Sequence, residues 1–247
     1  MFDTTTGEPT TRNGVYATNV EKKMGLKVST TCEMTFGEKE PAIGWLLGDV
    51  HNGIAQMFSV IEYARMLVGT KAIATLSTGY LNALDYAKTR VQGPDLIKMA
   101  DKASPRVTII HHPDVRRMLM TMRSVTQACR AMATVAAAAH DAAHAHPDAQ
   151  VRKENQAFYE FMVPLVKGYS TEMSLEVTSL GVQIHGGMGF IEETGAAQLY
   201  RDARILPIYE GTNGIQARDL VGRKVTKDGG ETMLALVAEM RSLVAEL

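Results

Sequence analysis

A long run of apolar residues at helical spacing is the feature that most limits what this chain can fold into. From Asn52 onward, apolar residues recur at steps of three and four positions, which places them on one face of an α-helix. They are Ile54, Met57, Phe58, Ile61, Ala64, Val68, Ala72 and Leu76. The pattern predicts a helix that continues to about Arg90 and is ended by Gly93 and Pro94. A helix of this length needs other long helices to cover its apolar face.

Two further helical patterns provide such partners. One begins at Pro113, a residue suited to the first turn of a helix, and is extended by the alanine run at residues 136–139. The other follows the break at residues 146–148 and continues towards Gly181, with an expected kink at Pro164. Long helices joined by short polar breaks are typical of an antiparallel bundle.

Residues 15–50 have a different character, because stretches that favour β-structure alternate with turn residues. They predict two or three strands. Within residues 27–36, alternation predicts a strand with one polar face, the other face being formed by Val28, Thr30, Cys32 and Met34. So small a group of strands is not stable alone in water and needs other structure to pack against. A short helical segment is also expected from Gln198 to Asp202.

Composition excludes several classes of partner. The chain of 247 residues is 45% hydrophobic and 21% charged, as in ordinary globular proteins. Its 26 basic and 27 acidic residues give a formal net charge of -1, so we expect neither nucleic acid nor an anionic membrane as a partner. No apolar run reaches the roughly 18 residues of a membrane span. Cys32 and Cys129 lack disulfide or zinc spacing, which favours free thiols and a cytoplasmic location.

Several histidines raise the alternative of a metal-binding protein. His140 and His144 are four residues apart and share a helix face, and Asp141 and His146 lie nearby. Their alanine-rich and acidic surroundings are more typical of a solvated helix end, and no cysteine or glutamate stands at ligand spacing. We therefore expect no metal.

The segment at residues 201–217 is the most informative for chemistry. Glu210 lies between an apolar run and a Gly-Thr-Asn-Gly turn, where its apolar flanks would remove water from a carboxylate and suit it to act as a general base. These flanks are Ile208, Tyr209 and Ile215. The amides of residues 211–214 could bind a phosphate or a polarised oxygen. The alternative is a helix N-terminus that Glu210 and Asn213 merely cap. The residues alone leave both open.

A glycine-rich stretch, QIHGGMGF at residues 183–190, also has two interpretations. Its close-set glycines would let a ligand or a neighbouring subunit approach the backbone. It is not a dinucleotide fingerprint, because the glycine spacing differs and no strand precedes it. The alternative is a helix C-cap followed by a tight turn.

Taken together and in this order, the segments from about Arg12 to Lys224 resemble the acyl-CoA dehydrogenase family. YEGTNGIQA is similar to the family's catalytic-glutamate segment, QIHGGMGF to its flavin-adenosine loop, and RDARI to the stretch before the base. YARMLVG and YAKTRVQG are similar to the start and end of its first C-terminal helix. The resemblance implies removal of the α-proton of an acyl-CoA thioester, with FAD as cofactor and a trans-2-enoyl-CoA as product.

The resemblance implies roles at the substrate. Glu210 matches the catalytic base, and Arg65 and Gly211 match positions near the acyl-CoA. In some branches the base sits just before the arginine that Arg65 matches, but here that position is Ala64, which takes no proton. Glu210 is therefore the candidate base under either pattern.

The resemblance also implies residues that hold FAD. Arg90 matches an arginine that reaches the FAD diphosphate of the partner subunit, and Gln183 and Gly187 match residues against its adenosine. Thr212 matches a threonine on the flavin nucleotide. A homodimer or homotetramer is thereby implied, with electron-transferring flavoprotein as the electron acceptor.

Two departures, Gly93 and Gly214, make the chain similar to the longer branch that includes methylthiopropionyl-CoA dehydrogenases. The resemblance implies a mainly α protein: the end of a β-domain at 1–50, an antiparallel four-helix bundle at 51–224, and the start of a truncated C-terminal helical extension at 225–247. Because the family's N-terminal helical domain and the first part of its β-domain are not included, a non-catalytic oligomerisation or interaction fragment that does not hold FAD by itself is the alternative function.

Overall fold

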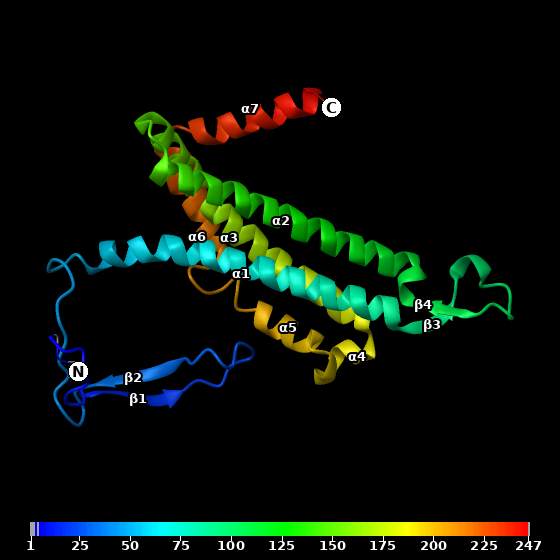
Figure 1. Ribbon diagram of the computed structural model, residues 1–247, viewed down its shortest axis with the longest axis horizontal. Coiled ribbons are helices and arrows are strands. Elements are labelled where there is room, and N and C mark those ends of the chain that lie inside the picture. The colour runs from blue at the N-terminus through cyan, green and yellow to red at the C-terminus, as the bar shows by residue number, and fades with distance from the viewer. Residues whose placement is uncertain (1–2, 4, 247) are drawn as a thin grey trace. The chain divides into compact units, whose positions relative to one another are not determined.

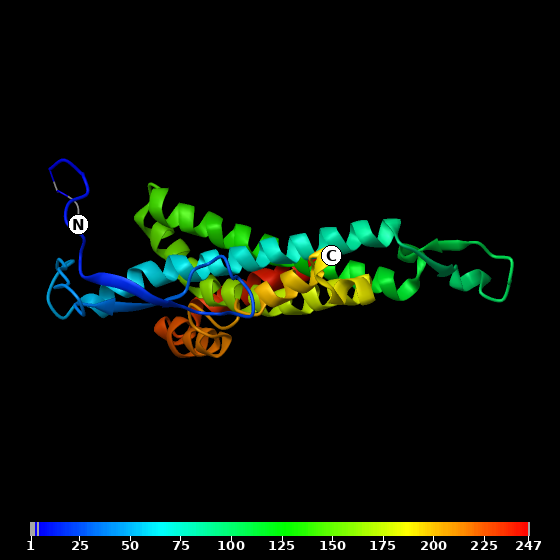
Figure 2. The same ribbon diagram turned by 90° about the horizontal axis from the view of Figure 1, so that it is seen from below.

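The protein is mainly helical and contains three long helices, as seen in a computed structural model that describes residue 3 and residues 5–246 (Figure 1). These helices are α1 (Gly53–Thr89), α2 (Pro113–Ala145) and α3 (Ala149–His185). They run antiparallel and lie side by side in both views (Figures 1 and 2). The expected bundle is confirmed. The outermost residues of the expected segments 1–50 and 225–247 lie outside the described residues.

The chain divides into two compact units, Met1–Val60 and Ile61–Leu247, with the boundary inside α1. The first unit contains an antiparallel pair of strands, β1 (Val15–Val20) and β2 (Cys32–Phe36), with a register irregularity between Ala17 and Asn19. The strand expected across residues 27–36 is thus shorter than predicted. Val28 precedes β2 and is 96% exposed, because alternation alone does not reveal that a turn occupies residues 27–29.

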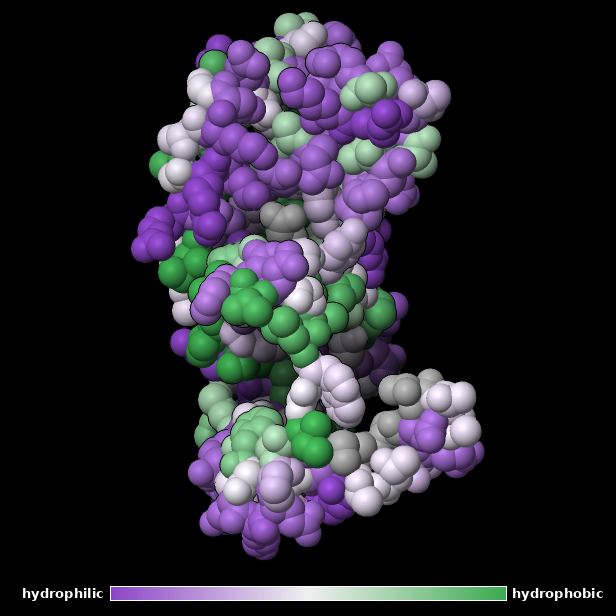
Figure 3. All heavy atoms as spheres, turned by 90° about the vertical axis from the view of Figure 1, so that its left-hand side faces the viewer, coloured by the Kyte–Doolittle hydropathy of each residue, from purple (hydrophilic) through white to green (hydrophobic). Residues whose placement is uncertain are grey.

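The beginning of α1 carries large apolar side chains that are exposed in the described part of the chain. They include Ile54, Met57 and Val60. Figure 3 shows hydrophobic side chains among those at the surface in that view. The apolar face predicted from the sequence is therefore covered only further along α1, where Val68, Ala72 and Leu76 are buried.

A β-hairpin joins α1 to α2, where the sequence predicted only the end of a helix. Its strands are β3 (Val91–Pro94) and β4 (Arg106–Thr108), and the 3₁₀ turns η1 (Leu96–Lys98) and η2 (Ile109–His111) follow each strand. Gly93 has a φ of 74°, in the left-handed region that favours glycine. A ring nitrogen of His112, Nε2, lies 2.7 Å from the carbonyl oxygen of Gln92 and links the hairpin to the start of α2.

The ends of the helices follow from local chemistry. Pro113 occupies the first turn of α2 as predicted, and the Asp148 side chain accepts a 2.7 Å hydrogen bond from the Gln150 amide at the start of α3. Helix α3 continues through Pro164 and past the expected end at Gly181, and stops at Gly186, whose φ is 60°.

The remaining elements follow α3 in the chain. They are α4 (Gly187–Phe190), η3 (Glu192–Thr194), α5 (Ala196–Ala203), α6 (Asn213–Asp219), the π-helical η4 (Leu220–Val225) and α7 (Glu231–Glu246). α5 confirms the short helix expected from Gln198 to Asp202. α6 and η4 continue one another without a break and form the fourth helix of the bundle.

Apolar clusters lie between the helices of the second unit. Leu76, Met122 and Val177, from α1, α2 and α3, are at most 1% exposed and belong to one cluster. A smaller cluster joins Ala72 of α1 to Ala203 and Leu206, which fixes the segment just before Glu210 against the bundle. Within the described residues, no helix has the combination of length and hydrophobicity that crossing a membrane requires.

Candidate functional site

Glu210 lies in an irregular turn between α5 and α6. Its φ is 54° and that of Gly211 is 85°, so two successive residues occupy the left-handed region. This conformation is natural for glycine but uncommon for glutamate, which adopts it only where neighbouring groups hold the backbone in place. Thr212 then caps α6, because its Oγ1 accepts a 3.4 Å hydrogen bond from the Ile215 amide.

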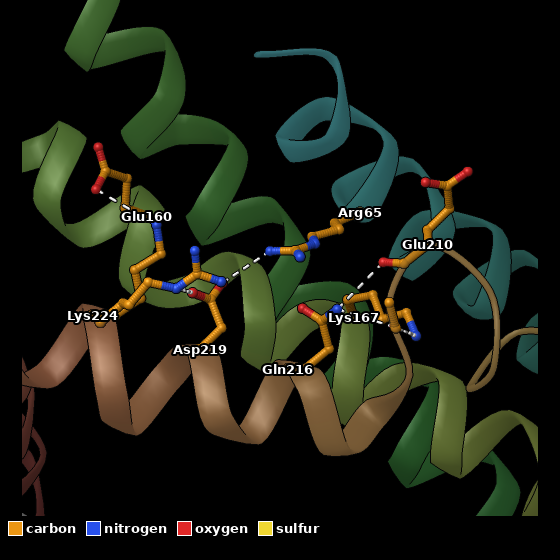
Figure 4. A network of polar contacts seen from close by, with 9 residues as sticks. Arg65, Glu160, Lys167, Glu210, Gln216, Asp219 and Lys224 are labelled. Atoms are coloured by element: carbon orange, nitrogen blue, oxygen red, sulfur yellow. Dashed lines mark hydrogen bonds and ion pairs between the residues drawn. The ribbon is translucent and has the colours of Figure 1, made fainter. Parts of the chain in front are cut away.

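Buried donors hold the backbone carbonyls of this turn (Figure 4). Lys167 Nζ donates to the Gly211 carbonyl at 2.7 Å, and Gln216 Nε2 donates to the Gly211 and Glu210 carbonyls at 3.1 and 3.4 Å. Lys167 and Gln216 are 0% and 1% exposed. The Glu210 carboxylate points away from both donors (Figure 4). The turn thus directs its carbonyls inward and its acidic side chain outward.

Asn213 links the turn to α3 through both ends of its amide. Its Oδ1 accepts hydrogen bonds of 3.1 Å from Lys167 Nζ and from Thr171 Oγ1. Its Nδ2 donates to the Gly168 carbonyl at 3.1 Å and to Glu172 Oε2 at 2.7 Å. The alternative in which Asn213 caps the helix is therefore wrong: Thr212 caps α6, and the Asn213 side chain is directed at α3.

Arg65 is a second buried cation near the turn, besides Lys167. Its Nη1 donates to Asp219 Oδ2 at 2.9 Å, and the two side chains are 8% and 4% exposed. Arg223 bonds the other oxygen of Asp219 at 2.7 Å. Arg65 Nη2 lies 3.5 Å from where a Cβ on Gly211 would stand, so the two residues assigned to substrate lie together. In the described part of the chain, Arg65 Nε and Gln216 Oε1 are buried without hydrogen-bond partners.

The electrostatics of the site centre on Lys167. The pKa of its ammonium is lowered to about 8, mainly by burial and also by the nearby charge of Arg65, while Glu172 and Glu210 act in the opposite direction. A lysine with this pKa releases its proton far more readily than an exposed one.

The surroundings of Glu210 differ from the sequence expectation. Its side chain is exposed, and Ile208 and Ile215 are 44% and 38% exposed. The expected apolar enclosure of the carboxylate is therefore wrong for this chain. Neighbours along the sequence do not cover Glu210, because the turn directs its side chain away from the buried donors Lys167 and Gln216 (Figure 4).

Three other predicted residues line one pocket, of about 690 Å³, at the end of the bundle near the β3–β4 hairpin. They are Arg90, Gln183 and Gly187. The pocket also contains Tyr86 and His185, whose rings stack with centroids 4.4 Å apart, and the His185 Nδ1 lies 2.7 Å from the Gly181 carbonyl oxygen. Residues far apart in the sequence thus form a single cavity.

The polar groups of this pocket are available to a ligand. Arg90 and Gln183 are exposed, and among the described residues their side chains make no hydrogen bond or ion pair. Gly186 caps α3, which confirms the helix C-cap alternative, and a Cβ at Gly186 or Gly187 would meet only open space. A guanidinium, an amide and bare glycine backbone are suited to a phosphate and a flat polar ring.

The predicted residues therefore form two groups. Glu210, Gly211 and Thr212 share the turn beside Arg65, whereas Arg90, Gln183 and Gly187 share the pocket. The roles of the buried polar residues Lys167, Gln216 and Asp219 were not predicted from the sequence. Lys167 had a usable signal, because it is a single charge in the otherwise apolar stretch FMVPLVKGY.

The histidine cluster has aromatic rather than metal-binding geometry. His140 packs against His144 and Tyr159 with ring centroids 4.2 and 4.8 Å apart, and His144 Nδ1 lies 2.8 Å from the His140 carbonyl oxygen. In residue 3 and residues 5–246, no three histidine, cysteine or acidic side chains are grouped so as to hold a metal ion.

Comparison with known proteins identifies the family to which the chain belongs. Residues 51–225 match the family described as acyl-CoA dehydrogenase, C-terminal domain. The chain belongs to the acyl-CoA dehydrogenase family. This acyl-CoA dehydrogenase chain is 52% identical over 249 aligned residues to the broad-specificity linear acyl-CoA dehydrogenase FadE5 of Mycobacterium tuberculosis, with 99% of the chain covered. It is 50% identical over 226 residues to the 3-methylmercaptopropionyl-CoA dehydrogenase of Ruegeria pomeroyi, with 92% covered.

The acyl-CoA dehydrogenase chain spans only 40% and 37% of the length of these two relatives. Among solved structures, Caenorhabditis elegans ACDH-11 in complex with C11-CoA matches 99% of the chain and 37% of its own length, with a TM-score of 0.79 at 23% identity. Butyryl-CoA dehydrogenase from Megasphaera elsdenii matches 85% of the chain and 48% of its own length, with a TM-score of 0.65 at 24% identity. These two structures support the fold.

Proposed function

We propose that this chain is the C-terminal portion of a flavin-dependent acyl-CoA dehydrogenase that converts an acyl-CoA thioester to a trans-2-enoyl-CoA, with Glu210 as the catalytic base. The observation that carries the proposal is the Glu210 turn. A glutamate in left-handed backbone, tied inward by buried donors and exposed at its carboxylate, is held for a purpose other than packing.

In this proposal the chain's own residues orient and deprotonate the substrate. The Glu210 carboxylate takes the proton from the carbon next to the thioester carbonyl, and the Glu210 backbone amide donates a hydrogen bond to that carbonyl and so acidifies the carbon. Gly211 and Arg65 lie beside this position. The flavin, when bound, supplies the two-electron acceptor for the hydride that leaves the neighbouring carbon.

We assign the pocket to the nucleotide part of FAD. Arg90 would pair with the diphosphate, and Gln183 and Gly187 would contact the adenosine, with Thr212 on the flavin nucleotide. The support is chemical: a cation and an amide without partners among the described residues face a cavity of about 690 Å³.

The pocket also supports a homodimer or homotetramer, because its residues match those that serve a flavin held mainly by a neighbouring subunit. We further propose electron-transferring flavoprotein as the acceptor and the cytoplasm as the location, since both cysteines are free. The segments 1–50, 51–224 and 225–247 would be the end of a β-domain, the four-helix bundle and the start of a C-terminal helical extension.

Because the chain spans less than half the length of its relatives, the alternative is a non-catalytic oligomerisation fragment that does not hold FAD alone. Equilibrium dialysis of the chain against FAD tests this alternative. Retention of FAD by the isolated chain contradicts it.

The base is tested by Glu210→Gln in a full-length protein that contains this chain. The amide keeps the shape of the side chain but cannot take the proton, so anaerobic bleaching of the flavin by acyl-CoA should slow by about 10²–10⁴-fold while FAD and acyl-CoA still bind. The matched control is Glu176→Gln, an exposed glutamate on α3. Bleaching of the Glu210→Gln protein at the wild-type rate shows that Glu210 is not the base.

A further inference from the structure

Lys167 is a fully buried lysine to which the proposed reaction gives no role. It is 0% exposed on α3, in a stretch that is otherwise apolar. Burying an ammonium costs several kcal/mol unless hydrogen bonds satisfy it, so a lysine is a costly choice if the position only fills space. The charge is therefore expected to act on the groups that it contacts.

The ammonium is directed at the turn rather than at an acidic partner. Its hydrogen bonds go to the Gly211 carbonyl at 2.7 Å and to Asn213 Oδ1 at 3.1 Å. Among the described residues, no carboxylate lies within ion-pair distance of it. Two hydrogen bonds thus compensate the burial of the charge directly. Here both acceptors belong to the turn that presents Glu210.

The turn needs such support from outside. Left-handed backbone costs a residue with a side chain roughly 1–2 kcal/mol, and Glu210 and Gly211 adopt it in succession. Gln216 also reaches both carbonyls, but at 3.1 and 3.4 Å, so the bond from Lys167 is the shortest of the three. Figure 4 shows the donors on one side of the turn and the Glu210 carboxylate on the other.

We propose that Lys167 is a positioning residue for Glu210: by holding the Gly211 carbonyl against α3, it fixes the direction in which the turn presents the Glu210 carboxylate and amide. This inference rests on the proposed role of Glu210 as the base. Lys167 does not touch the substrate, and its effect passes through the backbone of residues 210–211.

The test is Lys167→Met, which keeps the length of the side chain and removes the donor. The variant is expected to fold, because Gly211 keeps the hydrogen bond from Gln216 and Asn213 Oδ1 keeps the one from Thr171. In a full-length protein that contains this chain, flavin reduction at saturating acyl-CoA should slow by about 10–100-fold. The acyl-CoA concentration at half-maximal rate should change by less than about threefold.

A second readout needs neither cofactor nor turnover. Amide hydrogen exchange of residues 208–212 should accelerate by about tenfold in Lys167→Met, with exchange along α3 unchanged. The matched control is Lys153→Met, an exposed lysine on the same helix. Should Lys167→Met fail to fold by circular dichroism, Lys167→Gln replaces it, since glutamine keeps a polar group in the same space.

The outcomes separate the two proposals. Unchanged flavin reduction in the Lys167 variant, or faster exchange spread equally along α3, overturns the positioning role. If Glu210→Gln reduces its flavin at the wild-type rate, the proposed base is wrong, whatever the exchange of the turn shows. Slow reduction with both Glu210→Gln and Lys167→Met, together with exchange that accelerates only in the turn, supports the positioning role.

Discussion

The pocket beside the β3–β4 hairpin and the turn at Glu210 use their polar groups in opposite ways. In the pocket, Arg90 and Gln183 are exposed, and among the described residues their side chains have no partners. At the turn, Lys167, Gln216 and Asn213 donate their hydrogen bonds to backbone carbonyls or to neighbouring side chains. The donors of the pocket are therefore free to bind a ligand, whereas those of the turn hold the backbone that carries the Glu210 carboxylate.

The difference teaches how to tell binding residues from positioning residues in one molecule. Removing a binding side chain should weaken ligand binding and leave the free energy of unfolding unchanged, because that side chain makes no hydrogen bond or ion pair within the folded chain. Removing a buried group that is already paired should cost stability or loosen the backbone it holds. Three substitutions test this contrast.

The largest effect on stability is expected from Asp219→Asn. The change removes the charge that balances Arg65, and both side chains are less than 10% exposed. An unbalanced buried cation should lower the free energy of unfolding by about 3–5 kcal/mol in urea denaturation. The control, Asp141→Asn, alters a carboxylate that is 88% exposed. It should change the free energy of unfolding by under about 0.5 kcal/mol. A loss below about 1 kcal/mol for Asp219→Asn would show that the pair is not a buried one.

A smaller effect is expected from the protonation of Lys167. Burial lowers the pKa of this lysine from 10.5 to about 8, so between these values the unfolded chain holds a proton that the folded chain has released. Stability should therefore rise with pH in this window, by on the order of 3 kcal/mol. Urea denaturation of the wild type should show this rise relative to Lys167→Met, in which the other titrating groups are the same. If the difference in free energy of unfolding between the wild type and Lys167→Met does not change from pH 8 to 10.5, burial does not lower the pKa of Lys167.

The comparison also shows what the sequence can and cannot predict. Periodicity predicted α1 almost to the residue, and Pro113 marked the start of α2, because both signals are local. The β3–β4 hairpin was missed since strands of four and three residues are too short to show alternation. Glu210 could be proposed from its flanking turn and from the family resemblance.

The support of the turn was not predictable in the same way. Lys167 lies 44 residues from Gly211, and Arg65 lies 154 residues from Asp219. Contacts over such separations depend on how the helices pack, and a single lysine in a helical pattern is usually solvated. The expected burial of the Glu210 carboxylate was wrong for the same reason. Apolar neighbours along the chain do not determine the direction in which a left-handed turn points a side chain.

The smallest effect on stability is expected from Arg90→Met, and this prediction is the sharpest test of the contrast. Arg90 is exposed, and within the described residues its guanidinium has no partner, so the free energy of unfolding should change by less than about 0.5 kcal/mol. Binding of ADP, which carries the diphosphate and adenosine of FAD, should nevertheless weaken by about tenfold in isothermal titration, because one charge-assisted hydrogen bond to phosphate is lost.

The matched control is Arg123→Met, an exposed arginine on α2 that does not line the pocket and should leave ADP binding unchanged. If both variants weaken ADP binding equally, the nucleotide is attracted by general positive charge rather than held in the pocket. If Arg90→Met instead destabilises the chain as Asp219→Asn does, Arg90 is a structural residue and the division between the two regions fails.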